Sequence, residues 1–161
     1  MNKLRLILGD QLNINHSWFK ENNSKITYVM MEVKEETSYV LHHAQKIIAT
    51  FAAMRFFAEQ LQQKGFEVIY FKINDKQNKQ SFYQNINKTI KEKNIGELQY
   101  LEPDEYRLST ELKKLESIEN IKVESVDTEH FLVPKLYAKD FFFEKKHWRM
   151  EEFYRNMRKK F

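Results

Sequence analysis

Residues 4–12 read LRLILGDQL, an apolar run of strand length that stops at a glycine followed by two polar side chains. Residues 26–33, ITYVMMEV, form a second run that is almost continuously apolar, as expected of a strand buried on both faces. Strands of this kind are typical of a parallel sheet covered by helices on both sides. The two runs therefore predict an α/β fold.

The rest of the sequence alternates between strand-length and helix-length segments. Further apolar runs occur at residues 66–71, 98–101 and 121–126. Apolar side chains recur at helical spacing in the intervening segments 47–61, 82–90 and 108–115. Gly65 follows the first helix, where a left-handed C-cap is expected, and the second helix is expected to end near Gly96. Right-handed crossovers then predict a doubly wound, Rossmann-like parallel sheet of about five strands with helices on both faces.

The composition of the 161-residue chain excludes several classes of site. Length allows one packed domain. Because the chain has no Cys, it cannot form disulfides, thiolate nucleophiles or Cys-ligated zinc and iron-sulfur sites. The first residues lack the pattern of a signal peptide and no apolar run is long enough for a membrane span, so we expect a cytoplasmic protein without a membrane partner.

The net charge of +4 is concentrated at the end of the chain. Residues 141–161 hold seven basic and three acidic side chains, and residues 1–140 are balanced. A neutral body argues against a protein that coats nucleic acid. We therefore expect an α/β domain over residues 1–140 and a basic amphipathic helix over residues 141–161, with Met150, Met157 and Phe161 on an apolar face that something must cover.

Ligands of open α/β sheets bind at the carboxyl ends of the strands. Asp10 and Gln11 follow the first strand, and Glu32 and Glu36 follow the second, so we expect both segments to border one crevice. Neither a GxGxxG nor a GxxxxGK[ST] motif is present, which argues against a phosphate cradle. Asp10 and Gln11 suit hydrogen bonds to a heterocycle or to ribityl hydroxyls, although Asp10 could instead only cap the turn that Gly9 permits.

The remaining polar residues give weaker signals. His42 and His43 are adjacent, which is poor spacing for a helical metal site, so we expect one to face the crevice and the other to pack or cap. Arg55 is expected at the surface with its stem on the sheet. The loop at residues 102–107 can reach the same crevice, or its acidic residues can complement a helix dipole. No catalytic residue or metal ligand is predicted.

Several blocks of the sequence together resemble one protein family. They are LILGDQL at 6–12, EV at 32–33, SYVLHH at 38–43, AMRFFA at 53–58, EP at 102–103, YR at 106–107 and MEEFYRNMR at 150–158. In collinear order they resemble the N-terminal domain of the prokaryotic iron-sulfur photolyase and cryptochrome family, also called deoxyribodipyrimidine photolyase-related proteins.

The resemblance implies a light-harvesting domain of a DNA repair or blue-light protein. In such proteins the N-terminal α/β domain carries an antenna chromophore, typically 6,7-dimethyl-8-ribityllumazine, and a following helical domain carries FAD, a four-cysteine 4Fe-4S cluster and the lesion pocket. The implied parent is a (6-4) photolyase that alone contacts DNA. We expect this chain to be an excised domain or a natural truncation, with the helical domain or a second copy covering the C-terminal helix.

The resemblance also implies which residues hold the chromophore. The first loop contributes Gly9, Asp10, Gln11 and Leu12. The second loop and helix start contribute Glu32, Glu36, Tyr39, His42 and His43. The helix turns contribute Lys46 and Thr50. We expect Asp10 and Glu36 to hydrogen-bond to the ring system, and Leu12, Tyr39 and Thr50 to pack against it.

Two other functions remain open. The chain could be a free-standing small α/β enzyme that acts on a nucleotide or nucleoside. It could also be an interaction domain whose C-terminal helix docks on a partner or on a second copy. An in-frame helical domain with a set of Cys residues after residue 161 would favour the antenna domain over both.

Overall fold

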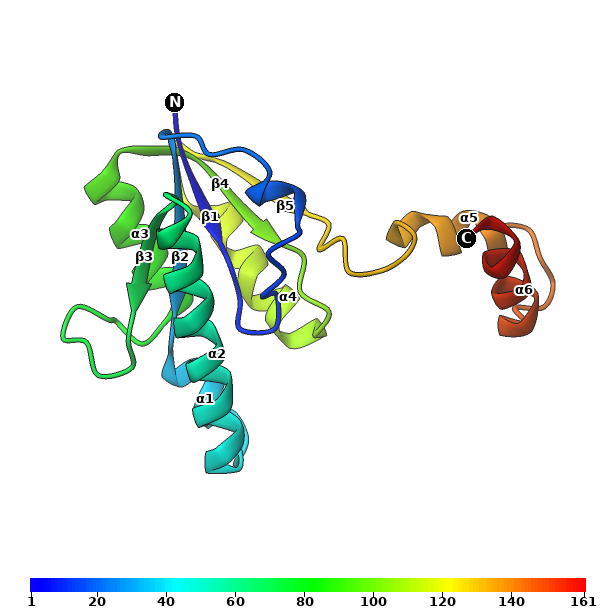
Figure 1. Ribbon diagram of the computed structural model, residues 1–161, viewed down its shortest axis with the longest axis horizontal. Coiled ribbons are helices and arrows are strands. Elements are labelled where there is room, and N and C mark those ends of the chain that lie inside the picture. Colours follow the sequence, from blue (N-terminus) through cyan, green and yellow to red (C-terminus); the bar gives the residue numbers. More distant parts are fainter. The chain divides into compact units, whose positions relative to one another are not determined.

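The apolar runs of the sequence form five parallel strands in the computed structural model (Figure 1). They are β1 (Asn2–Leu6), β2 (Ile26–Met31), β3 (Glu67–Phe71), β4 (Ile95–Leu101) and β5 (Lys122–Val126). The strand order is β3-β2-β1-β4-β5, so the chain runs outward from β1 in one direction and then returns to build the other half. This is the doubly wound α/β fold predicted from the sequence.

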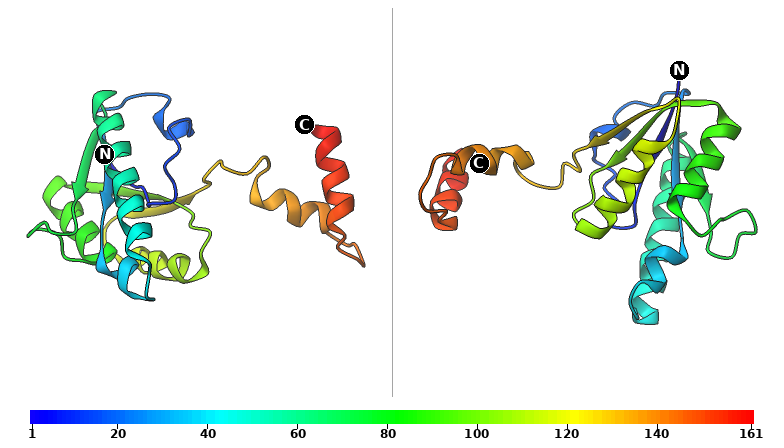
Figure 2. Two further views of the ribbon diagram at one scale, coloured as in Figure 1. Left: turned by 60° about the horizontal axis from the view of Figure 1, so that its bottom comes forward. Right: turned by 180° about the vertical axis from the view of Figure 1, so that it is seen from behind.

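Helices cover both faces of the sheet. They are α1 (Lys34–Ser38), α2 (Ala44–Gln63), α3 (Phe82–Lys93) and α4 (Tyr106–Lys113), with short 3-10 helices η1 (Ser17–Phe19) and η2 (Lys114–Ser117). Helix α2 lies on one face, and α3 and α4 lie on the other (Figures 1 and 2). The start of α2, together with α1, extends past the carboxyl ends of the strands (Figure 1).

Alternating strand side chains build two hydrophobic cores. Leu4 and Leu6 of β1 pack with side chains of α3 and α4. Ile7, immediately after β1, and Tyr28 of β2 pack with side chains of α2 and η1. Because successive side chains of a strand point to opposite faces, both faces of each central strand must be apolar. This explains why the first two runs of the sequence lack the polar alternation of a half-exposed strand.

Backbone geometry at the helix ends agrees with the predictions. Gly65 follows α2 with φ +85°, which confirms the predicted left-handed C-cap. Helix α3 ends at Lys93, near Gly96 as predicted, and its left-handed C-cap residue is Asn94, with a φ of 51°. Gly96 itself lies in β4. Asn tolerates this conformation better than most residues, so no glycine is needed there.

The chain divides into two units, Met1–Thr128 and Glu129–Phe161. The second contains α5 (Lys135–Phe142) and α6 (Met150–Lys160). Phe142 stacks on Phe153 with ring centroids 5.7 Å apart, and Met157 is buried. The unit therefore begins before the boundary predicted at 140/141, because α5 packs on α6. On the predicted apolar face Met150 and Phe161 stay exposed.

The structure describes residues 1–161, except that only the backbone of Lys135 is described. Within this described part, none of the helices combines the length and the apolar character needed to cross a bilayer.

The left-handed backbone at Gly65 should make a substitution there destabilising. A Cβ at φ +85° strains the backbone, so Gly65→Ala should lower the free energy of unfolding by about 1 kcal/mol. Urea denaturation measures the change. Gln63→Ala, an exposed change at the end of α2, is the control and should stay within about 0.5 kcal/mol of the parent chain. Equal stability of the two variants would contradict the assignment.

Candidate functional site

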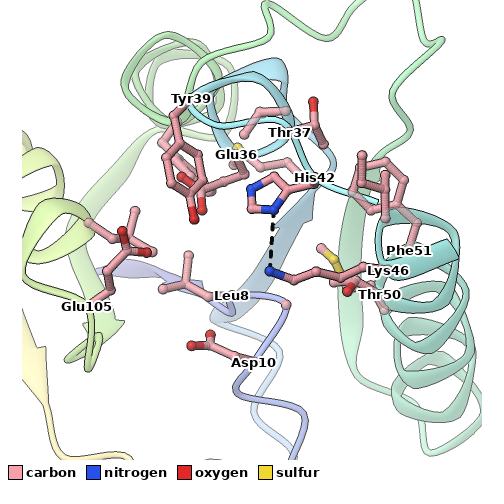
Figure 3. A pocket seen from close by; sticks show the side chains of 17 residues that line it. Leu8, Asp10, Glu36, Thr37, Tyr39, His42, Lys46, Thr50, Phe51 and Glu105 are labelled. Carbon is pink, nitrogen blue, oxygen red and sulfur yellow. Dashed lines mark hydrogen bonds between the residues drawn. The ribbon is translucent and has the colours of Figure 1, made fainter. Parts of the chain in front are cut away.

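A cavity of about 260 Å³ lies at the carboxyl ends of β1 and β2 (Figure 3). Its apolar wall comes from the strand ends and from α2, α3 and α4, and consists of Leu8, Met31, Val33, Ile47, Phe51, Met54, Phe82 and Leu108. Its polar lining comes from the loop after β1, the β2–α2 connection, α2 and the start of α4, and consists of Asp10, Glu36, Thr37, Tyr39, His42, Lys46, Thr50 and Glu105. An apolar wall with a few convergent polar groups is typical of small-molecule sites, whose volumes are about 300–1,000 Å³.

Gly9 lets α2 approach the end of β1 closely. A Cβ on Gly9 would lie 3.0 Å from Sδ of Met54 and 3.1 Å from Cγ2 of Thr50. The φ of Gly9 is not positive, so close approach, rather than the special bend expected from the sequence, explains the glycine. A side chain at this position would require Met54 and Thr50 to shift.

Gln11, rather than Asp10, closes the turn after β1. The Gln11 backbone N–H donates to the Leu8 carbonyl, and its side-chain Oε1 accepts from the Leu8 N–H at 3.2 Å. Its Nε2 donates to the Leu101 carbonyl at 3.1 Å. The Asp10 carboxylate is exposed and points toward the cavity (Figure 3), and it has no hydrogen-bond partner among the described residues. Asp10 therefore remains available to a ligand.

Glu32 is a structural residue. It is fully buried and receives hydrogen bonds from Arg55 at 2.6 and 2.8 Å, from Tyr70 Oη at 2.7 Å and from the Ile73 N–H at 2.8 Å. Burial alone would raise the pKa of Glu32, but these hydrogen bonds outweigh it and hold the pKa below its ordinary value. Arg55 is exposed, as expected, and its guanidinium also ties α2 to the end of β2.

The two histidines divide as the sequence predicted. His42 lines the cavity, whereas His43 is the N-cap of α2 and its Nδ1 accepts a hydrogen bond from the Gln45 N–H. The Lys46 ammonium lies 3.4 Å from His42 Nδ1 (Figure 3), and because an ammonium only donates, this nitrogen is the acceptor.

The structure thus brings together most, but not all, of the residues proposed for the chromophore. Those that line the cavity are Gly9, Asp10, Glu36, Tyr39, His42, Lys46 and Thr50. Those that do not are Gln11, Leu12, Glu32 and His43. Gln11, Glu32 and His43 satisfy backbone and side-chain partners elsewhere, and Leu12 packs against the hydrophobic core on the α2 face of the sheet.

Sequence reasoning missed Arg107 as a partner of the cavity residues. Its guanidinium donates to the Glu36 carboxylate at 3.1 and 3.2 Å and to Glu105 Oε1 at 2.8 Å. Its Cζ lies 3.8 Å from the ring centroid of Tyr39, which in turn contacts His42 edge-on at 4.9 Å. A line of contacts therefore runs from α4 to α2 beside the cavity. The loop at 102–107 was the available signal, since it was expected to reach this edge.

The charges around the cavity affect the Glu36 carboxyl. Burial raises the pKa of Glu36, Arg107 lowers it, and the nearby carboxylates of Glu105 and Asp10 raise it, with a raised pKa as the result. Arg107 is itself partly buried, which would lower its pKa, but its hydrogen bonds to Glu105 and Glu36 outweigh this and raise it. The guanidinium therefore stays charged and keeps Glu36 in place as an acceptor.

The arrangement can bind and orient a polar ring. The cavity lining has no Ser or Cys nucleophile paired with a base. Across the described residues, no group of three or more His, Asp or Glu side chains is placed to hold a metal ion. Fold and cavity together define a parallel α/β domain with a small-molecule pocket at the carboxyl edge of its sheet.

Comparison with known proteins supplies the family. The sequence matches the deoxyribodipyrimidine photo-lyase-related protein family over residues 5–161, and the chain belongs to this family. It is also 35% identical over 161 residues to a (6-4) photolyase of Agrobacterium fabrum (strain C58 / ATCC 33970). That match covers 99% of this chain and 32% of the relative, so the chain spans about a third of the relative's length.

Loss of the guanidinium partner of Glu32 should destabilise the fold. Arg55→Leu leaves a buried carboxylate with fewer donors, and we expect a loss of about 1–3 kcal/mol in urea denaturation at pH 7. The partial exposure of Arg55 places the effect below that of a fully buried pair. Lys91→Leu, which removes an exposed cation from α3, should change stability little.

The ion pair between Glu32 and Arg55 should make the stability of the fold depend on pH. Because the pKa of Glu32 is below its ordinary value of 4.5, its charged form stabilises the folded state above that pH, and this contribution disappears as the pH falls. The difference in stability between Arg55→Leu and the parent chain should therefore shrink below about pH 4. A difference that is constant from pH 7 to pH 3 would contradict the assignment.

Removal of Arg107 should raise the pKa of Glu36 further. In Arg107→Leu, burial and the neighbouring carboxylates act without the cation, which favours the protonated form. Carboxyl ¹³C NMR titration of both proteins measures the pKa. Lys114→Leu, which removes an exposed cation from η2, is the control and should leave Glu36 unchanged. The same titration midpoint in Arg107→Leu and the parent chain would show that the two groups are not coupled.

Proposed function

We propose that this domain binds an antenna chromophore, 6,7-dimethyl-8-ribityllumazine, in the cavity at the carboxyl edge of the sheet. The observation that carries the proposal is the cavity itself, since seven of the residues expected to hold the chromophore converge on it from three segments of the chain. The domain would then absorb light and pass the energy on, and it would have no catalytic residues of its own.

The chemistry of the lining fits this ligand. The lumazine is a flat bicyclic ring with carbonyl oxygens, ring nitrogens and a chain of hydroxyl groups. Apolar side chains such as Val33 and Met54 can pack against the ring, and Lys46 can donate to a carbonyl oxygen. The carboxylates of Asp10 and Glu36 can accept from hydroxyl or ring N–H groups. We therefore keep the roles that the sequence suggested for Asp10, Glu36, Tyr39 and Thr50, and replace Leu12 by the apolar residues of the wall.

We propose further that the domain serves a longer protein. The relative from Agrobacterium fabrum is a (6-4) photolyase, and this chain matches 32% of its length. In this proposal FAD and a 4Fe-4S cluster belong to a helical domain outside residues 1–161, DNA contacts belong to the whole protein, and the location is cytoplasmic. Because this chain has no Cys, the proposal places the Cys-ligated cluster outside it.

Titration with the lumazine tests the proposal. Binding should change the fluorescence of the ligand and saturate at one site per chain. Asp10→Ala removes a carboxylate that faces the cavity, and we expect it to weaken binding by about tenfold, the effect of one charge-assisted hydrogen bond. Glu21→Ala removes an exposed carboxylate that does not line the cavity and serves as the control.

The outcomes separate the hypotheses. Saturable binding that is weakened about tenfold in Asp10→Ala and unchanged in Glu21→Ala supports the antenna domain. Failure to bind the lumazine would contradict it. Binding of a nucleoside at the same cavity, followed by its chemical conversion, would support the free-standing enzyme instead.

A further inference from the structure

The cavity carries more negative than positive charge. Asp10, Glu36 and Glu105 present carboxylates to it from three separate segments (Figure 3). Lys46 is the cation of its lining. Arg107 lies beside the cavity, but two of the three carboxylates already hold its guanidinium. The guanidinium therefore offsets charge without offering free donors to a ligand.

At the starts of α2, α3 and α4, side chains oppose the binding of an anion. Helix N-termini bind phosphate through free backbone N–H groups. At α3, however, the Phe82 N–H already donates to the Glu35 carboxylate at 3.0 Å. At α2, the Gln45 N–H donates to His43. At α4, the N-cap residue is Glu105, whose carboxylate repels an approaching anion.

A phosphate and a hydroxyl group would interact differently with the side chains that line the cavity. A phosphate ester carries about −1.5 to −2 charges at pH 7 and offers almost only acceptor oxygens. The Lys46 ammonium, which also contacts His42, would be its main donor. A hydroxyl group can instead donate to the carboxylate of Asp10, which has no hydrogen-bond partner among the described side chains and backbone groups.

We propose that Asp10, Glu36 and Glu105 make the cavity selective for ligands without phosphate, namely a heterocycle with a neutral polyol chain, over the corresponding 5′-phosphates. This selectivity rests on the proposed function and adds a substrate class to it. By the same reasoning, the cavity should bind nucleosides more tightly than nucleotides. Electrostatic repulsion, rather than shape, is the discriminating force.

The test compares matched ligand pairs. Dissociation constants are measured by fluorescence titration for 6,7-dimethyl-8-ribityllumazine and its 5′-phosphate, and in parallel for riboflavin and flavin mononucleotide. We expect the phosphate to weaken binding at least about tenfold at low salt, as expected for two added negative charges near a net negative, partly exposed site. The ratio of the dissociation constant of the phosphate to that of the unphosphorylated ligand should shrink at about 0.5 M NaCl, because salt screens exposed charges.

Charge-neutral variants identify the source of the selectivity. Glu105→Gln keeps the shape of the side chain and removes one charge, so it should reduce the ratio of the two dissociation constants about threefold or more. Asp10→Asn should reduce the same ratio, whatever its effect on the affinity for the lumazine. Glu111→Gln, on the exposed side of α4, is the matched control and should leave the ratio unchanged.

The possible results are distinct. Tight binding of the lumazine with a ratio near one, or with a ratio unaffected by Glu105→Gln and salt, would overturn the selectivity and leave the proposed function intact. Binding of the phosphate alone would overturn both. If neither ligand binds, the proposed function fails, and the selectivity for this ligand class fails with it.

Discussion

The position of α2 over the end of the sheet depends on the buried carboxylate of Glu32. This side chain lies at the end of β2, and it receives hydrogen bonds from Arg55 on α2, Tyr70 on β3 and the Ile73 N–H beyond β3. A buried charge is tolerated only with such a full set of donors. Because Lys46 and Thr50 lie on the same helix, the ion pair indirectly sets one wall of the cavity. Glu32, which was proposed to contact the ligand, thus affects the cavity by holding α2 in position.

Carboxylates, instead of a glycine-rich loop, determine which ligand groups the cavity favours. Doubly wound domains that bind dinucleotides use backbone N–H groups at the first turn to hold phosphate. Here the Gln11 side chain accepts a hydrogen bond from the Leu8 N–H in the turn after β1. Gly9 allows α2 to lie close to the end of β1. The same fold position therefore presents the Asp10 carboxylate, which favours hydroxyl and N–H donors. Arg107 keeps the carboxylate of Glu36 fixed nearby.

The sequence predicts the fold well because burial leaves a periodic pattern. Strand-length apolar runs and helical spacing are local signals, and all five strands and the doubly wound order were found. The site is less predictable because side-chain partners are distant in sequence. Glu32 and Arg55 are separated by 23 residues, and Glu36 and Arg107 by 71, with no local pattern to connect them. The prediction for Leu12 was wrong for a different reason. This loop residue packs against the hydrophobic core on the α2 face of the sheet, and no local pattern indicates that.

The most direct measurement is the mapping of the lumazine on the protein by ¹H–¹⁵N NMR. If the chromophore occupies the cavity, saturating ligand shifts the amide signals of the loop after β1 and of residues 36–50, and leaves those of residues 129–161 in place. Intermolecular contacts from the ring to the methyl groups of Val33 and Met54 would place it against the apolar wall. Shifts confined to the second unit, or no saturable shifts at all, would contradict the account.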